Sequence, residues 1–216
     1  MADYSGLHDA ILTGDARKAE EVTKQAIEEG ADPTELLSKY MIPAMDEVGN
    51  KFECNEYFVP ELLIAARAMK AALELLTPRL AESGAKAAGR VVIGTVKGDL
   101  HDIGKNLVAS MLEGGGFEVV DLGVDVPPEK FVEAAQEKEG TIVAMSALLT
   151  TTMTNMSTVI DALEQAGLRD KVRVMVGGAP VTQEFADQIK ADGYSDNASA
   201  AVALARRLAG ELAAAG

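Results

Sequence analysis

The sequence has few of the features expected of a secreted or membrane protein. Its 216 residues include a single cysteine, Cys54, so neither an internal disulfide nor a multi-cysteine metal site can form. No apolar run approaches the roughly 20 residues that a membrane-spanning helix needs. The first residues also lack the basic stretch and apolar run of a signal peptide. We therefore expect a cytoplasmic protein.

Positive charge and aromatic side chains are also scarce. The chain has 20 Lys and Arg against 34 Asp and Glu, which gives a formal net charge of -14. Nucleic acids and anionic membrane surfaces are bound largely through Lys and Arg, so this balance argues against both as partners. Aromatic residues make up 4% of the chain, while hydrophobic residues reach 48%. This composition favours helices packed through small and aliphatic side chains.

The pattern of the first 80 residues is helical. A helix is expected over 10–29, ending at Gly30. Asp32 and Pro33 then have the cap and first-turn signals of a second helix, which Pro43 kinks or restarts. A last helix begins near Pro60. Apolar residues recur at steps of three and four, which predicts a small bundle of about four helices: Leu37, Tyr40, Met41, Ala44, Met45, Val48, Leu62, Ala66, Met69, Leu73 and Leu76.

The rest of the chain has a different periodicity. Residues 81–89 lack large apolar side chains and predict a linker between domains over 1–80 and 90–216. Strands are then expected over 91–96, 117–121, 141–145, 172–176 and 193–194, and helices over 103–113, 127–138, 153–165, 181–190 and from 198 onward. Strict alternation of strand and helix predicts a doubly wound, parallel α/β sheet. Ligands of such sheets bind beyond the carboxyl ends of the strands.

Three strand ends contain the polar and glycine residues that a site needs. They supply Gly98, Asp99, His101 and Gly104 after the first strand, Ser146, Thr150 and Thr152 after the third, and Gly177 and Gly178 after the fourth. The glycines fit ordinary turns, and they also fit a bulky ligand that passes close to the backbone. The hydroxyl residues fit a helix cap, and they also fit a bond to the polar tail of a ligand. Both interpretations stand at this stage.

His101 is a candidate metal ligand, although a lone histidine is more often structural. Asp99 lies two residues before it, where its carboxylate can accept the second ring N–H and fix the tautomer. A zinc site normally takes three or four protein ligands, and the only other histidine, His8, lies in the helical half. A metal held in a macrocycle needs only one axial ligand from the protein. A cobalt corrinoid fits that requirement.

These motifs resemble those of a known family. The segment Asp99-Leu100-His101-Asp102-Ile103-Gly104 matches the Asp-x-His-x-x-Gly signature of cobalamin-binding domains, and Ser146-Ala147-Leu148 and Gly177-Gly178 match its two further motifs. Residues 45–52 and 56–62 are similar to the helical cap of methyl-transferring B12 proteins. Nearly the whole chain thus resembles the corrinoid proteins of methylamine, methanol and methoxyaromatic methyltransferase systems, and the corrinoid module of methionine synthase. Thr150-Thr151-Thr152 is most like the methylamine type.

The resemblance implies a role for individual residues. His101 is expected as the lower ligand of cobalt, hydrogen-bonded to Asp99, with Thr152 where a serine often extends that relay. The benzimidazole tail of the cofactor is expected in a slot between strands and helices. The cap is expected over the upper face of the cofactor, with Phe52, Tyr57, Phe58 and Val59 as contacts unless they are ordinary bundle core. The remaining expected cofactor-binding residues are Gly98, Asp102, Ile103, Gly104, Ser146, Leu148, Thr150, Gly177 and Gly178.

The function implied by the resemblance is that of a methyl carrier. A substrate-specific methyltransferase places a methyl group on Co(I), and a second methyltransferase passes it from methyl-Co(III) to an acceptor. A reductive activating protein is a further expected partner, and the chain itself supplies no catalytic residue. The alternatives are the B12-binding subunit of a mutase, a B12-binding sensor, or a flavodoxin-like interaction domain without a cofactor. A mutase subunit would lack the helical half, and a sensor would need an additional signalling or DNA-binding module.

Overall fold

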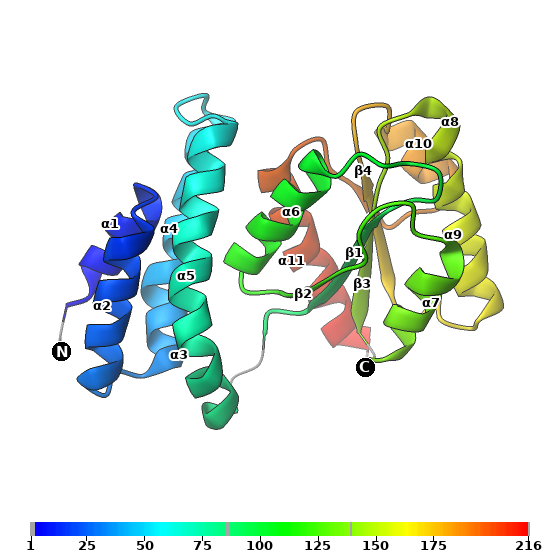
Figure 1. Cartoon of the computed structure of the whole chain (residues 1–216). Helices are drawn as coiled ribbons and strands as arrows, with labels where there is room; N and C mark the ends of the chain where they lie inside the picture. Colours follow the sequence, from blue (N-terminus) through cyan, green and yellow to red (C-terminus); the bar gives the residue numbers. More distant parts are fainter. Residues whose placement is uncertain (1–2, 85–86, 139, 216) are drawn as a thin grey trace. The chain divides into compact units, whose positions relative to one another are not determined.

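The computed structural model describes residues 3–84, 87–138 and 140–215. The chain divides into two compact units, one of Met1–Ala87 with Glu113–Gly116 and one of Ala88–Leu112 with Phe117–Gly216. The first is helical and the second is α/β, as the two periodicities predict (Figure 1). Across the described residues, no helix is both long enough and apolar enough to cross a membrane.

In the part of the chain that the structure describes, the helical unit contains four rods of helix, the number that the sequence predicts. Because α3, the π-helical turn η1 and α4 follow one another without a break, they form a single rod. Asp32 caps it by accepting the backbone N–H of Thr34 at 2.7 Å, and Pro43 lies in the first turn of α4, where a new helix start is expected. The elements are α1 (Ser5–Leu12), α2 (Ala16–Glu28), α3 (Pro33–Leu36), η1 (Leu37–Met41), α4 (Ile42–Glu53) and α5 (Val59–Ser83).

Two boundaries of the helical unit differ from those predicted. The single helix expected over 10–29 is wrong, because Gly14 adopts a φ of 75° and Asp15 caps a new helix by accepting the backbone N–H of Lys18. A Cβ at position 14 would also lie 2.5 Å from Cγ1 of Ile64. The linker expected over 81–89 is helical as far as Ser83, where α5 ends at the left-handed Gly84. Residues 85–86 lie outside the described residues.

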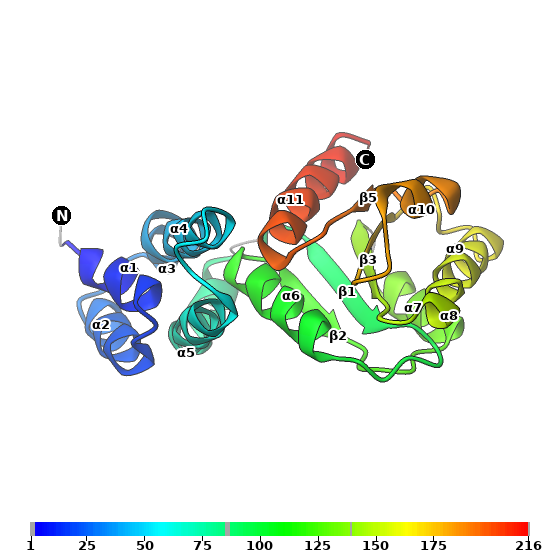
Figure 2. The ribbon, with the colours of Figure 1, turned by 90° about the horizontal axis from the view of Figure 1, so that it is seen from above.

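The α/β unit is the doubly wound parallel sheet that the sequence predicts, with strand order β2-β1-β3-β4-β5. Helices α6 and α11 cover one face, and α7 and α9 cover the other (Figure 2). The expected helix over 153–165 begins earlier and is divided, and the one over 181–190 is shorter. The elements are β1 (Arg90–Thr95), α6 (Ile103–Gly114), β2 (Glu118–Asp121), α7 (Pro128–Gln136), β3 (Thr141–Ser146), α8 (Thr150–Met153), α9 (Asn155–Gln165), β4 (Arg173–Gly177), α10 (Gln183–Gln188), β5 (Gly193–Tyr194) and α11 (Ala198–Ala215).

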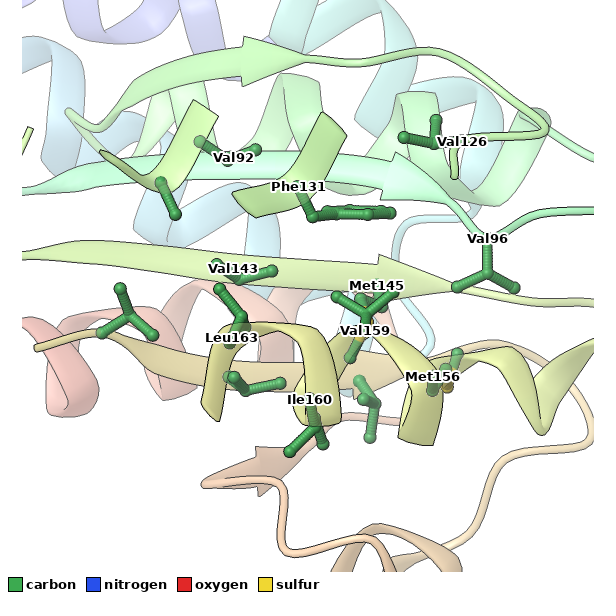
Figure 3. Packing of buried hydrophobic residues seen from close by; sticks show 14 of the residues in the cluster. Val92, Val96, Val126, Phe131, Val143, Met145, Met156, Val159, Ile160 and Leu163 are labelled. Atoms are coloured by element: carbon green, nitrogen blue, oxygen red, sulfur yellow. The ribbon is translucent and has the colours of Figure 1, made fainter. Parts of the chain in front are cut away.

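The sheet packs against α7 and α9 through alternate side chains of its central strands. Val92 of β1 and Val143 of β3 are paired in register and lie in one buried cluster with Phe131 of α7 (Figure 3). Gly94 makes room for that aromatic ring, since a Cβ there would lie 2.8 Å from Cζ of Phe131. Full burial of each such side chain contributes about 1.5–3 kcal/mol.

The packed strands end together, which places the predicted site segments at one edge. Thr95, the last residue of β1, pairs with Ser146 of β3, and Ser146 pairs in turn with Gly177 of β4. The loops that follow β1, β3 and β4 therefore leave the sheet side by side. This is the edge at which ligands of open parallel sheets bind.

The substitution Gly94→Ala tests this packing. We expect it to lower the free energy of unfolding by about 1–3 kcal/mol, because the added methyl group forces the buried Phe131 ring to move. Gly210→Ala is the matched control, since Gly210 lies in α11 with no atom within 4 Å of a built Cβ. Urea unfolding followed by circular dichroism measures both. Equal stability of the two variants would contradict the packing described.

Candidate functional site

Asp99 is the centre of the site and is fully buried. Its Oδ1 accepts two hydrogen bonds from His101, one from the backbone N–H at 3.1 Å and one from the ring Nδ1 at 2.8 Å. Its Oδ2 accepts the backbone N–H groups of Leu148 at 2.8 Å and Leu149 at 3.3 Å, and the hydroxyl of Thr152 at 2.6 Å. One carboxylate thus joins the loop after β1 to the loop after β3.

The hydrogen bonds keep Asp99 ionised. Burial by itself raises the pKa of this carboxyl group, but the hydrogen bonds from Thr152, Leu148 and His101 outweigh it and hold the pKa well below its ordinary value. The carboxylate therefore accepts a hydrogen bond from a protonated Nδ1 of His101. This leaves Nε2 as the nitrogen that can bind a metal. The His101 side chain is 51% exposed, whereas Asp99 is inaccessible. A buried anion thus orients an accessible imidazole.

Three residues that the sequence analysis missed fix the loop between β1 and α6. The buried hydroxyl of Thr95 donates to the carbonyl of His101 at 2.9 Å. Asp125 accepts the N–H of Gly98 at 2.7 Å, and its own N–H donates to the carbonyl of Asp99 at 2.9 Å. The side-chain amide of Asn155 donates to the carbonyl of Lys97 at 2.7 Å. A hydroxyl residue at the end of a strand of apolar residues is a sequence signal that could have identified Thr95. Asp125 and Asn155 contact only backbone groups, and such contacts leave no signal in the sequence.

The site glycines have different explanations. Gly98 and Gly178 adopt φ angles of 81° and 122°, and a Cβ at Gly178 would lie 1.9 Å from the carbonyl oxygen of Ala147. At Gly177 a Cβ would lie 3.1 Å from the carbonyl oxygen of Ser195. The protein's own backbone therefore explains both glycines at the end of β4, Gly177 by a close contact and Gly178 by its turn. Gly104 differs, since a Cβ there would have no neighbour within 4 Å, so the space beside it is open.

Large apolar side chains are exposed on the two loops that Asp99 joins. Leu100 and Ile103, on either side of His101, are 71% and 81% exposed, and Leu148 and Leu149 are 44% and 43% exposed. Exposed apolar side chains grouped in this way mark a binding surface. An accessible imidazole among aliphatic side chains fits a metal held in a broad, largely apolar macrocycle.

The remaining predicted residues of the α/β unit lie at the same sheet edge. Asp102 is exposed before α6, Ser146 ends β3 half-buried, and Thr150 is exposed as the first residue of α8. The alternative that the hydroxyl residues cap this helix is wrong, because the cap position is Leu149 and no side chain caps it. The Thr152 hydroxyl is instead bonded to Asp99.

Phe58 and Val59 lie at the start of α5 in the helical unit. They are 60% and 41% exposed, so the alternative that they belong to the bundle core is wrong for both. The N–H of Phe58 donates to the carboxylate of Glu61, which fixes this end of the helix. Tyr57 is half-buried, with its hydroxyl bonded to the carbonyl of Leu12 at 3.2 Å, and Phe52 is also half-buried.

Comparison with known protein families agrees with the geometry. Residues 89–203 match the family model of the B12 binding domain, and residues 4–77 match a second B12 binding domain model. The chain therefore contains B12 binding domains. Among the residues that the structure describes, no group of three or more His, Cys, Asp or Glu side chains is placed to hold a metal ion. The two matches cover both units.

Individual relatives narrow the class. The chain is 49% identical to the trimethylamine corrinoid protein of Methanosarcina barkeri over 90% of this chain and 91% of that one, and 44% identical to dimethylamine corrinoid protein 3 of Methanosarcina acetivorans over 96% and 99%. A cobalamin-binding protein from Desulfitobacterium hafniense superposes with a TM-score of 0.77 at 35% identity, covering 95% and 98% of the two chains. The methanol:cobalamin methyltransferase complex of Methanosarcina barkeri gives 0.83 at 34% identity, covering 95% and 78%. The chain belongs to the family of corrinoid proteins of methylamine and methanol methyltransferase systems.

The hydroxyl of Thr152 is testable by an isosteric pair. We expect Thr152→Val to lower the free energy of unfolding by about 1–3 kcal/mol, because Asp99 loses a buried hydrogen bond that nothing replaces. Thr152→Ser retains the hydroxyl and should keep most of the stability. Urea unfolding of the cofactor-free protein measures the difference. A valine variant as stable as the serine variant would show that this hydrogen bond does not support the site.

Proposed function

We propose that the chain is a methyl carrier in which His101 is the axial protein ligand of the corrinoid cobalt. The observation that carries the proposal is the pairing of a half-exposed imidazole with a fully buried carboxylate. When bound, the corrinoid supplies a cobalt ion that accepts a methyl group and gives it up again. The chain's own residues bind that group, orient its ligand and limit access to it.

Asp99 and Thr152 act on the ligand rather than on the methyl group. Asp99 holds Nδ1 of His101, so Nε2 would be the nitrogen left to bind the metal, with a fixed ring orientation. Thr152 holds the other carboxylate oxygen, which keeps Asp99 from turning toward any other donor. A proton on Nδ1 would thus stay between two fixed groups, whether or not Nε2 is bound to the metal.

Other residues of both units would hold the corrinoid itself. The exposed aliphatic side chains of Leu100, Ile103 and Leu148 would lie against the macrocycle and exclude water from the ligand. Ser146, Thr150, Gly177 and Gly178 would line the slot for its nucleotide tail, and Gly98, Asp102 and Gly104 would contact it near the ligand. For the helical unit we propose that Phe58 and Val59 contact the bound corrinoid, with residues 1–80 acting as a cap.

The partners are proposed from the relatives. Two relatives with similar sequences are named for trimethylamine and dimethylamine. One similar structure is a methanol:cobalamin methyltransferase complex. The complex supports a substrate-specific methyltransferase as the donor partner. A second methyltransferase that serves the acceptor and a reductive activating protein are proposed only from the family resemblance. Methylamines are the donors that we propose for this chain.

The ligand assignment can be tested with the whole protein reconstituted with hydroxocobalamin and reduced to Co(II). With histidine labelled with ¹⁵N, we expect His101→Ala to bind the corrinoid and to lose the ¹⁵N doublet from its electron paramagnetic resonance spectrum, because no imidazole of the protein reaches the cobalt. His8→Ala is the matched control, as His8 is the chain's other histidine, and should retain the splitting. An unchanged spectrum for the His101 variant would overturn the assignment.

The donor can be identified by supplying the reconstituted protein with trimethylamine, dimethylamine, methanol or a methoxyarene, each with a methyltransferase specific for it. We expect methylation of the bound corrinoid, followed by its visible spectrum, to be fastest with a methylamine. Equal inactivity with every donor, despite tight cofactor binding, would contradict a carrier function and favour a sensor.

A further inference from the structure

Thr95 is a buried polar residue whose hydroxyl has no part in the function described so far. It ends β1, where it follows four residues without a polar side chain (91–94), and it is 0% exposed. Its side chain lies on the opposite face of the sheet from Val92 and Val96, because alternate residues of a strand face opposite sides. Its backbone is fixed on both sides, with its N–H donating to Gly123 at 3.0 Å and its carbonyl accepting the N–H of Val126 at 3.0 Å.

The hydroxyl of this fixed residue donates to the carbonyl of His101 at 2.9 Å. The two hydrogen bonds that His101 makes with Asp99 end on the same oxygen, Oδ1. Bonds to a single atom form a pivot about which the residue can still turn. The hydrogen bond from Thr95 holds the carbonyl of His101, on the other side of its Cα. It therefore prevents His101 from turning about Oδ1 of Asp99.

We propose that Thr95 is a positioning residue that fixes the direction in which His101 presents Nε2. The proposal rests on the proposed function, in which His101 is the axial ligand. Thr95 itself is fully buried and acts only through its hydrogen bond to the backbone carbonyl of His101. Loss of one buried hydrogen bond corresponds to about a fivefold change in an equilibrium. We therefore expect about a fivefold fall in the ratio of histidine-bound to histidine-free cobalt when the hydroxyl is removed.

Three variants separate this role from a general effect on stability. Thr95→Val removes the hydroxyl and keeps the shape of a residue suited to a strand, while Thr95→Ser restores the hydroxyl. Thr141→Val is the matched control, because Thr141 is a buried strand threonine whose hydroxyl also donates to a loop carbonyl, that of Lys138 at 2.6 Å. It lies at the start of β3, at the other end of the sheet from the site.

The hydrogen bond itself is measured in the cofactor-free protein. Labelling the histidine carbonyl carbons with ¹³C gives one nuclear magnetic resonance signal for each of His8 and His101. Thr95→Val should shift the His101 signal upfield and leave that of His8 in place, while Thr95→Ser and Thr141→Val should leave both near their wild-type positions. An unshifted His101 signal in the valine variant would refute the role of Thr95. Because the protein contains no cofactor in this measurement, that result would not depend on which residue binds the cobalt.

The consequence for the ligand is measured in the protein loaded with hydroxocobalamin and reduced to Co(II). With histidine labelled with ¹⁵N, the share of the spectrum with the ¹⁵N splitting should fall in Thr95→Val, recover in Thr95→Ser and stay at the wild-type value in Thr141→Val. Identical spectra for wild type and Thr95→Val, both with the splitting, would refute the role of Thr95 and leave His101 as the ligand. Loss of the splitting already in the wild type would refute both.

Discussion

The buried carboxylate of Asp99 is the group on which the rest of the site depends. An ionised group without access to water is strongly unfavourable unless hydrogen bonds compensate for its lost hydration. Asp99 receives them from the loop after β1 and from the loop after β3, so its ionisation requires both loops to close in one arrangement. His101 contributes two of those bonds and is at the same time half-exposed. The requirement to stabilise a buried charge thus also fixes the direction of an accessible imidazole.

The sheet makes this arrangement possible by bringing distant segments to one edge. Residues 99 and 152 are far apart in the chain, but β1 and β3 are parallel neighbours whose ends lie in register. Left-handed glycines then turn the chain sharply, most of all at Gly178, where any side chain would collide with the loop after β3. The exposed aliphatic side chains around His101 complete a surface that suits a broad apolar cofactor. This surface supports the proposal that the protein binds and orients a reactive group that supplies the chemistry.

The sequence predicts the parts of this structure that local patterns control. The strand and helix order follows from periodicity, and the site motif is visible because Asp99 and His101 are two residues apart. The break at Gly14 was missed because a helical pattern continues across it, and the turn depends on the close approach of Ile64. Asp125 and Asn155 were missed because they lie far along the chain from the motif and bond only its backbone, and Thr95 because its hydroxyl also bonds a backbone group, the carbonyl of His101. Exposure of Phe58 also required the structure, since its spacing fits a bundle core equally well.

The most direct test of the Asp99–His101 assignment is isotopic and leaves the sequence unchanged. The protein would be grown with ¹⁵N-labelled histidine, loaded with unlabelled hydroxocobalamin and reduced to Co(II). If His101 binds the cobalt, the nitrogen splitting of each line should change from the triplet of ¹⁴N to the doublet of ¹⁵N. A triplet that persists in the labelled protein would show that the nitrogen belongs to the cofactor's own benzimidazole, and would contradict the role assigned to His101.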